Sequence, residues 1–414
     1  MSSKEDTADP SGGSDSLGDV RRAFGLTVCF LVLLLDGFDT TSIAFVAPVL
    51  ASEWDIPVSG FAPAFVATSV GAVVGYVACG PLAQRFGQRA VGAASVALFG
   101  LGTLSLALAW DITSLSALRF VSAIGLGGAV PISLVAATQF VADHRKETAT
   151  MLVASGLSAG AVTGGLLGGP LLRAYGWEAV FVIGGLLPLL FLPAFSRVLR
   201  SAAPRPEGPL QQKPGANLFA QLFTGGLARQ TALLWAFSFV IFVVTHALIF
   251  WTPSLLLEFS FEREQVSLGT AAFGMGGLVG NLLMASVVAA VGTKRLLALI
   301  LVLAMACVVA ISQFDMPMSI LLLLIAGLGA GTISGCVGEA VLAISLYPRH
   351  LRATGVGCAT AVGRVGSIFG PAVGGLLVAL HWPARDVFLT ALLPLALALV
   401  ALALLGNPFR RTEA

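Results

Sequence analysis

Two aspartates, Asp36 and Asp39, lie inside a long apolar run of this 414-residue chain, in the stretch LLLDGFDTTSIAF at residues 33–45. A carboxylate at the centre of a lipid-spanning helix costs at least about 2.5 kcal/mol, so it is expected to face water, a partner or a bound molecule. Residues three apart share one face of a helix, and two close carboxylates do not both stay ionised easily. The pattern therefore predicts a site that binds and releases protons, and a permanent structural ion pair or contacts at a helix end are the alternative.

Four more ionisable side chains lie within other apolar runs, namely Arg119, His246, Glu339 and Arg364. A helix rises about 1.5 Å per residue, so Arg119 should lie at nearly the same height in the bilayer as the two aspartates. We therefore expect Arg119 to pair with them. A structural role for Arg119, in which it bridges two helices, is the alternative.

Arg364 is expected near the midplane of its apolar run. An arginine can hold a carboxylate through two parallel hydrogen bonds, so Arg364 is the leading candidate for binding an anionic substrate, with a structural role as an equal alternative. Glu339 lies nearer the inner end of its run, where an ion pair at a gate is an equal interpretation. His246 and Asn281 are candidates for contacts with polar substrate groups, and a packing role is their alternative.

The composition places these groups in a membrane. Hydrophobic residues make up 57% of the chain and charged residues 11%, and the mean hydropathy is +0.93. These values are typical of an integral membrane protein and not of a soluble domain. The net charge of +2 is too small to indicate a nucleic-acid partner, so the expected surroundings are a lipid bilayer.

Twelve apolar segments reach the roughly 20 residues that a helix needs to cross a bilayer. They lie at 24–47, 61–79, 90–109, 114–137, 149–171, 178–199, 231–256, 266–290, 296–314, 319–345, 354–379 and 387–405. The sequence thus predicts an all-α membrane protein with two pseudo-symmetric six-helix bundles. The predicted parts are a disordered tail (1–22), a first bundle (23–199), a central loop (200–230), a second bundle (231–406) and a C-terminal tail (407–414).

Basic residues predict the orientation. Of the 23 Lys and Arg residues, 18 fall on the side of the two termini, two lie within spans, and three lie on the opposite side, namely Arg173, Arg263 and Arg385. Positive charge is enriched in cytoplasmic loops, so both termini are expected in the cytoplasm of a multi-pass protein of the cell inner membrane.

The two halves of the sequence resemble one another. GPLAQRFGQRAV (80–91) and ASVVAAVGTKRLL (285–297) follow the second span of each half, and Gly-Pro recurs at Pro170 and Pro371 in the fifth span of each. Duplicated six-span units are typical of secondary transporters that bind their substrate between the halves. No metal-ligand spacing, phosphate-binding loop or nucleophile–base arrangement occurs, so neither an enzyme nor a cofactor is expected.

Several motifs resemble a known family. GPLAQRFGQRAV is similar to the loop motif of the major facilitator superfamily, and RFVSAIGLGGAVP (119–131) resembles its fourth-span pattern. LLDGFDT (34–40) and YPRHLRATGVGCATAVGRVGSIFGPAVGG (347–375) are similar to its aromatic acid:proton symporter branch. The resemblance implies the major facilitator fold and uptake of acids such as hydroxybenzoates or protocatechuate. It also implies important acids at Asp36 and Asp39 and motif arginines at Arg119 and Arg364.

Height in the bilayer and proximity in sequence indicate further sites. The substrate ring is expected to contact Phe38, Phe45 and Trp251, and the expected gating residues are Arg85, Arg89, Arg145, Glu339 and Arg352. The chain departs from the family pattern at Gln84, where the loop motif usually has Asp, and at Gln139, Phe140 and Ala142, where the next inner loop usually carries Glu-Tyr and Pro. These losses of carboxylates should weaken the charge contacts that hold the inner gate.

We therefore expect a monomeric, proton-driven importer of a small aromatic carboxylate that works by alternating access without a cofactor. Arginine and aspartate can bind a carboxylate and a proton whether or not the substrate carries an aromatic ring. A symporter of aliphatic mono- or dicarboxylates is therefore an alternative. A proton-coupled exporter is another. A transport-inactive sensor or scaffold would need a sizeable soluble output domain, and the sequence shows none.

Overall fold

The computed structural model describes residues 12–142, 145–201, 218–224, 227–348 and 351–406. The first half comprises α1 (Gly12–Glu53), η1 (Val58–Phe61), α2 (Ala62–Phe86), α3 (Gln88–Leu106), α4 (Ile112–Thr138), α5 (Lys146–Tyr175) and α6 (Trp177–Ser201). The second comprises α8 (Ala228–Leu256), η3 (Leu257–Phe259), α9 (Ser267–Val291), α10 (Thr293–Gln313), α11 (Met318–Leu346), α12 (Arg352–Ala379), α13 (Ala384–Thr390) and α14 (Leu392–Leu404). The short α7 (Leu218–Gln221) lies between them in the chain.

The described residues contain 12 helical segments that are long and apolar enough to cross a membrane, so the predicted span number and the all-α fold are confirmed. α1 begins at Gly12, inside the segment expected to be a tail, whereas residues 1–11 lie outside the described part. The central loop and C-terminal tail fall largely on residues 202–217, 225–226 and 407–414, which also lie outside it.

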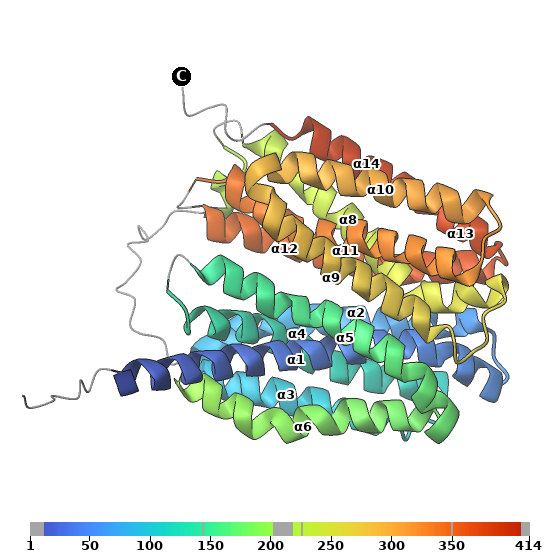
Figure 1. The fold of residues 1–414 in the computed structure, drawn as a ribbon, viewed down its shortest axis with the longest axis horizontal. Coiled ribbons are helices and arrows are strands. Elements are labelled where there is room, and N and C mark those ends of the chain that lie inside the picture. Colours follow the sequence, from blue (N-terminus) through green and yellow to red (C-terminus); the bar gives the residue numbers. More distant parts are fainter. Residues whose placement is uncertain (1–11, 143–144, 202–217, 225–226, 349–350, 407–414) are drawn as a thin grey trace, which may run out of the picture.

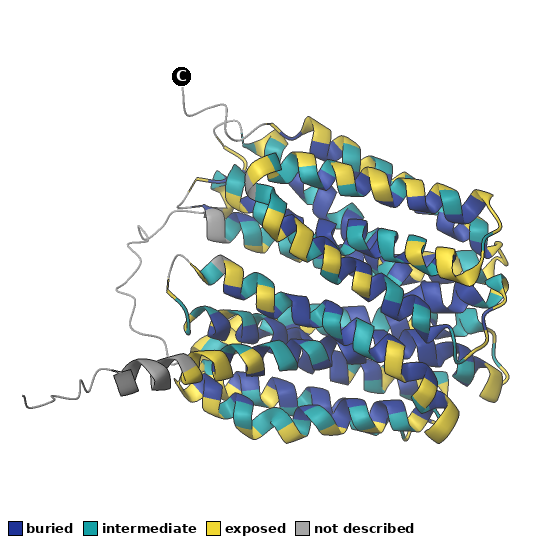
Figure 2. Cartoon of the chain, viewed as in Figure 1, coloured by how far each residue is buried: buried dark blue, intermediate teal, exposed yellow. Residues whose placement is uncertain are grey.

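Large apolar side chains face outward around the bundle. Leu108, Leu323 and Leu393 are 76%, 70% and 69% exposed, and Figure 2 shows exposed residues along the outer surfaces of helices whose inner faces are buried. An apolar surface of this kind is tolerated in lipid but would drive association in water. The outer faces are therefore suited to the bilayer.

The same helix pairs form in both halves. α1 packs on α5 and α2 on α4 in the first half, while α8 packs on α12 and α9 on α11 in the second. Glycine brings the backbones together, because a Cβ at Gly160 of α5 would lie 1.9 Å from the Leu34 carbonyl oxygen of α1. In the second half, a Cβ at Gly276 of α9 would lie 1.7 Å from the Ala326 oxygen of α11. Small residues allow such approach in membrane helices.

The halves contact one another mainly through α5 with α9 and α2 with α12. We call the end of the bundle at which α1 begins and α14 ends the terminal end, on the left of Figure 1, and the opposite end the far end. At the far end the Gly169 N–H donates to Ser267 Oγ at 3.1 Å, and the ring of Phe65 stacks on Phe250 with centroids 5.0 Å apart. The two halves are thus closed together at the far end.

Candidate functional site

A cavity of about 410 Å³ lies between the two halves, with walls from α1, α2, α4, α5, α8, α9, α11 and α12. Its volume is in the range of about 300–1,000 Å³ that small-molecule sites occupy. The lining reaches from Thr252 and Pro253 near the far end to Leu134 and Thr150 toward the terminal end. The ionisable side chains in this lining are Asp36, Tyr76, His246, Cys336, Glu339 and Arg364.

Among the described residues that line the cavity, Arg364 is the only Lys or Arg. Its guanidinium lies 4.2 Å from the ring centroid of Tyr76 and 5.7 Å from that of Phe242. The Nε atom of Arg364 is buried without a hydrogen-bond partner, and within the described part of the chain the side chain forms no ion pair. A cation beside two aromatic rings, with an unused donor at Nε, can bind a carboxylate that carries a ring.

Two carboxylates line the same cavity. Asp36 of α1 is 5% exposed, and its Oδ1 accepts a hydrogen bond from Thr40 Oγ1 at 3.1 Å. Glu339 of α11 is 1% exposed, and its Oε1 accepts from Thr360 Oγ1 at 3.4 Å. Both lie close enough to Arg364 for their charges to interact. Neither carboxylate forms an ion pair with any described residue.

Asp39 has a different environment from Asp36. Its Oδ2 accepts from Arg119 Nη1 at 2.8 Å, and its Oδ1 accepts from Thr103 Oγ1 at 2.8 Å. Arg119 Nη2 also donates to Ser42 Oγ at 2.9 Å and to the Asp39 carbonyl oxygen at 3.0 Å. The Asp39 and Arg119 side chains are both 0% exposed, and neither lines the cavity. The expected pairing of Arg119 thus occurs with Asp39 and not with Asp36.

Gly37 positions the two aspartates on either side of a tight helix contact. A Cβ at this residue would lie 2.0 Å from the Leu157 carbonyl oxygen of α5, so α1 can approach α5 here only with glycine. Asp36 precedes this contact and faces the cavity, whereas Asp39 follows it and faces Arg119 of α4. The DGFD motif therefore combines a close helix approach with two carboxylates in separate environments.

Asp111 fixes the start of α4, the helix that carries Arg119. Its Oδ1 accepts from the Ser114 backbone N–H at 2.7 Å, and Ser114 Oγ accepts from the Asp111 N–H at 3.1 Å. These reciprocal bonds form a capping box that stabilises the first turn. The hydrogen bonds from Ser114 to the carboxylate lower the pKa of Asp111 below its ordinary value. Arg119 follows two turns later on this anchored helix.

Of the other predicted substrate contacts, one lines the cavity and four do not. His246 lines the cavity, with its Nδ1 3.0 Å from the Phe242 carbonyl oxygen. Phe38, Phe45, Trp251 and Asn281 are absent from the cavity lining. Trp251 instead donates from Nε1 to the Pro371 oxygen at 2.9 Å, and a Cβ at Gly168 of α5 would lie 2.7 Å from the ring of Phe45. These rings pack helices together rather than face the cavity.

Sequence reasoning missed the aromatic rings that do line the cavity, which are Tyr76, Phe242, Phe250 and Phe273. A signal existed for two of them. Phe242 is four residues before His246 and shares its helix face, and its ring stacks on the imidazole with centroids 5.7 Å apart. Tyr76 is one of only three tyrosines in the chain and lies within a span.

The predicted gating residues lie toward the terminal end. Arg85 and Arg89 are exposed, and neither forms an ion pair with an acidic residue in the described part of the chain. The Arg85 guanidinium lies 5.2 Å from the ring centroid of Phe86. Arg145 directly precedes α5, and the Arg352 side chain lies outside the described part of the chain. Glu339 lies in the cavity wall and forms no gate ion pair with a described residue.

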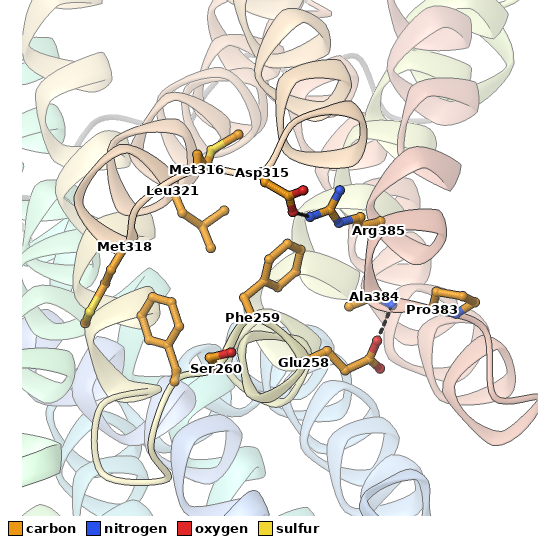
Figure 3. A pocket seen from close by; sticks show the side chains of 11 residues that line it. Glu258, Phe259, Ser260, Asp315, Met316, Met318, Leu321, Pro383, Ala384 and Arg385 are labelled. Carbon is orange, nitrogen blue, oxygen red and sulfur yellow. Dashed lines mark hydrogen bonds and ion pairs between the residues drawn. The ribbon is translucent and has the colours of Figure 1, made fainter.

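A second pocket, of about 380 Å³, lies at the far end within the second half. Figure 3 shows Arg385 directed at Asp315, with which it forms an ion pair, and Glu258 directed at the start of α13. The Glu258 Oε2 accepts from the Ala384 N–H at 2.8 Å. Arg385 and Asp315 are thus paired with one another and Glu258 is bonded to a backbone N–H, in contrast to Arg364 in the cavity.

The arrangement around Arg364 can bind an anion and exchange protons. No group of three or more His, Cys, Asp or Glu side chains that could hold a metal occurs in the described ranges. The cavity offers one arginine, two carboxylates that form no ion pair with a described residue, and several aromatic rings. These groups can recognise an aromatic carboxylate through charge and ring contacts.

Comparison with known families and proteins gives matches over nearly the whole chain. The model of the Major Facilitator Superfamily matches residues 29–341 and 257–414. The chain is 33% identical to the 3-(3-hydroxy-phenyl)propionate transporter of Escherichia coli, with 90% of each chain covered. It is 31% identical to the 4-hydroxybenzoate transporter PcaK of Pseudomonas aeruginosa, over 92% of this chain and 91% of the relative. It is 29% identical to the gallate transporter of Pseudomonas putida, over 94% and 92%.

Among solved structures, the chain is similar to a bacterial homologue of the human lysosomal transporter Spinster in an inward-facing, unoccupied conformation. The TM-score is 0.65 at 18% sequence identity, and the match covers 93% of this chain and 95% of that one. A likeness at this level of identity concerns the fold. It agrees with the two halves of six spans described above.

Proposed function

Because this chain belongs to the Major Facilitator Superfamily, whose members are transporters and not enzymes, we propose that it imports aromatic carboxylates together with protons. Three of its relatives are named as transporters of 4-hydroxybenzoate, gallate and 3-(3-hydroxyphenyl)propionate. These compounds share a carboxylate and a hydroxylated ring. The proposed substrate class is therefore small hydroxylated aromatic acids.

The observation that carries this proposal is the position of Arg364 between Tyr76 and Phe242. A carboxylate can accept hydrogen bonds from the guanidinium, and the adjacent rings can contact the substrate ring by edge or offset stacking. Phe250 and Phe273 extend this aromatic wall. An aliphatic acid would use the arginine but not the rings, so the site favours aromatic acids.

Proton coupling is assigned to the acids of α1. Asp36 faces the cavity and has no cationic partner among the described residues, so it can take up and release a proton as the cavity changes its exposure. Asp39 supports this site through its ion pair with Arg119, which holds α1 against α4. In this assignment Asp36 exchanges the coupled proton and Asp39 fixes the geometry. The proton gradient supplies the driving force, and no cofactor is required.

The proposed orientation places the terminal end in the cytoplasm and the chain in the cell inner membrane as a functional monomer. The structure then represents an inward-open state, because the halves are closed at the far end by the Gly169–Ser267 hydrogen bond and the Phe65–Phe250 stack. Alternating access requires these contacts to open while the terminal ends of α4, α5 and α11 close over the substrate. The paired use of α2 with α12 and α5 with α9 provides symmetric surfaces for this rocking motion.

Uptake by proteoliposomes tests the proposal. Labelled 4-hydroxybenzoate should accumulate when the interior is alkaline and should not accumulate when the pH gradient is collapsed. Unlabelled gallate should compete and succinate should not. Competition by succinate at equal concentration would favour the aliphatic acid symporter. Efflux of preloaded 4-hydroxybenzoate from the vesicles into an acidic exterior would favour the exporter.

A further inference from the structure

His246 lies at the centre of the α8 face that forms one wall of the cavity. Phe242 and Thr245 precede it on this face, and Ile249 and Pro253 follow it. Carboxylate binding and proton exchange are assigned to other residues, so neither accounts for an imidazole at this position. Its ring is placed to contact the molecule that the cavity binds.

The hydrogen bonding of the His246 ring determines which of its nitrogens carries the hydrogen. Nδ1 lies 3.0 Å from the Phe242 carbonyl oxygen. A carbonyl oxygen can only accept a hydrogen bond, so Nδ1 is the donor and carries the hydrogen. In the neutral imidazole the other nitrogen, Nε2, then has a free lone pair and acts only as an acceptor.

Nε2 of His246 is accessible to a bound molecule. It forms no hydrogen bond with a described residue, and it is not one of the buried unpaired nitrogen and oxygen atoms of the described part of the chain. Those buried atoms include the hydroxyl oxygens of Ser69, Thr252 and Thr270, which belong to the same cavity wall. The imidazole thus presents an open acceptor, whereas these hydroxyl oxygens are covered.

The ring of Phe242 lies next to both Arg364 and His246. The Arg364 guanidinium and the His246 imidazole are each 5.7 Å from the Phe242 ring centroid. The two groups are therefore no further apart than the sum of these distances, about 11 Å, which a hydroxybenzoate with a hydrogen bond of about 2.8 Å at each end can bridge. One aromatic acid can thus contact both groups at once.

The direction from Arg364 to His246 is toward the far end. A Cβ at Gly370, which follows Arg364 by six residues on α12, would lie 3.3 Å from the His246 carbonyl carbon. Glu339 lies in the opposite direction, because it accepts from Thr360, one turn before Arg364 on the same helix. A ring that extends from Arg364 toward the far end therefore reaches His246 and not Glu339.

We propose that His246 determines the specificity for the ring hydroxyl of the substrate. Its Nε2 accepts a hydrogen bond from a phenolic hydroxyl, while Arg364 holds the carboxylate and Phe242 contacts the ring. The hydroxyl keeps its proton, so no covalent step is involved. This inference rests on the proposed function and deepens it, because it names the group that separates hydroxylated aromatic acids from unsubstituted ones.

The proposal predicts an order of affinities. An acceptor without a hydrogen of its own favours ligands that donate, and 4-hydroxybenzoate and 4-aminobenzoate both carry a donor opposite the carboxylate. Benzoate and 4-fluorobenzoate carry none, although fluorine is close in size to a hydroxyl. The parent protein should therefore bind 4-hydroxybenzoate roughly 2- to 10-fold more tightly than benzoate. 4-Aminobenzoate should resemble the former and 4-fluorobenzoate the latter.

The experiment measures the Kd of these four acids by isothermal calorimetry with the purified full-length protein. His246→Phe keeps a ring beside Phe242 but has no acceptor, so it should bind 4-hydroxybenzoate only as tightly as benzoate and leave the Kd of benzoate unchanged. His246→Gln supplies an amide oxygen and should recover part of the preference. The matched control is His381→Phe, which alters an exposed histidine at the far end and should keep the ratio of the parent protein.

A preference for 4-hydroxybenzoate that persists in His246→Phe would overturn the proposal. An equal loss of affinity for benzoate and 4-hydroxybenzoate would also overturn it, because the imidazole would then act on the carboxylate or on packing. If His246→Phe does not fold, His246→Gln and the parent protein decide, and tight binding of 4-fluorobenzoate by the parent would contradict a donor requirement. Failure of the proposed function is distinguishable, because the parent protein would then bind none of the four acids.

Discussion

Arg119 donates to Asp39 across 2.8 Å between α4 and α1, and both side chains are entirely withdrawn from solvent. Thr103 of α3 donates to the same carboxylate, and the guanidinium lies 5.5 Å from the ring centroid of Phe181 on α6. Four helices of the first half therefore meet at this pair. Its position away from the cavity indicates that it maintains the shape of the half and does not contact the substrate.

Asp39→Asn should destabilise the protein by about 3–5 kcal/mol, because Arg119 would remain as a buried cation without its counter-charge. Thermal unfolding in detergent should show the loss. The double variant Asp39→Asn with Arg119→Gln should be less destabilised than Asp39→Asn alone. The matched control Asp36→Asn removes an acid that forms no ion pair with a described residue and should not lower the unfolding temperature. Equal stability of Asp39→Asn and the parent protein would contradict the structural role of the pair.

Arg364→Gln should weaken substrate binding roughly 10- to 100-fold, because hydrogen bonds to charged groups contribute about 1.5–3 kcal/mol. Arg364→Lys should recover only part of this loss, since an ammonium cannot form the two parallel hydrogen bonds of a guanidinium. The measurement is the KM for 4-hydroxybenzoate uptake in proteoliposomes. Arg385→Gln, which alters an arginine of the far-end pocket, is the control and should leave the KM unchanged. A normal KM for Arg364→Gln would remove this residue from the binding site.

Tyr76 should act through its ring and not through its hydroxyl. Its centroid lies 4.2 Å from the Arg364 guanidinium, and a cation–π contact of this kind contributes about 0.5–2 kcal/mol. Tyr76→Phe should therefore retain the affinity of the parent protein, whereas Tyr76→Leu should lose roughly 2- to 30-fold. Substrate affinity measured by isothermal calorimetry distinguishes the two. A loss of affinity in Tyr76→Phe equal to that in Tyr76→Leu would indicate that the hydroxyl is what matters.

The fold was largely predictable because it depends on signals that act along the chain. Apolar length sets the number of spans, and the repeated motifs around Gly87 and Gly292 reflect the same turn in both halves, with φ values of 87° and 84°. The early start of α1 was not predictable from hydropathy. A polar segment such as Gly12–Asp19 can continue a helix beyond the apolar run without altering its hydropathy signal.

The site was predictable in its charges but not in its rings. A charge within a span must be compensated, which identified Asp36, Asp39, Arg119 and Arg364 from sequence. An aromatic side chain can line a cavity or pack between helices, so the residue type alone does not predict which of the two it does. The sequence therefore did not distinguish Phe45 and Trp251, which pack between helices, from Tyr76 and Phe242, which line the cavity. The sequence also did not predict that Asp36 and Asp39 would lie in separate environments, because this depends on which side of the α1–α5 contact each residue faces.

Gly37 provides the strongest test of that division. In Gly37→Ala the added methyl would lie 2.0 Å from the Leu157 carbonyl oxygen, which is backbone and cannot rotate away, so α1 must move from α5. Both aspartates should then shift, and we expect lower expression of folded protein together with loss of uptake. Gly80→Ala is the matched control, because a Cβ there meets nothing within 4 Å. Fluorescence-detected size-exclusion chromatography and uptake assays measure the two effects. If Gly37→Ala behaved like Gly80→Ala in both assays, the close approach of α1 and α5 could not be what separates the two acids.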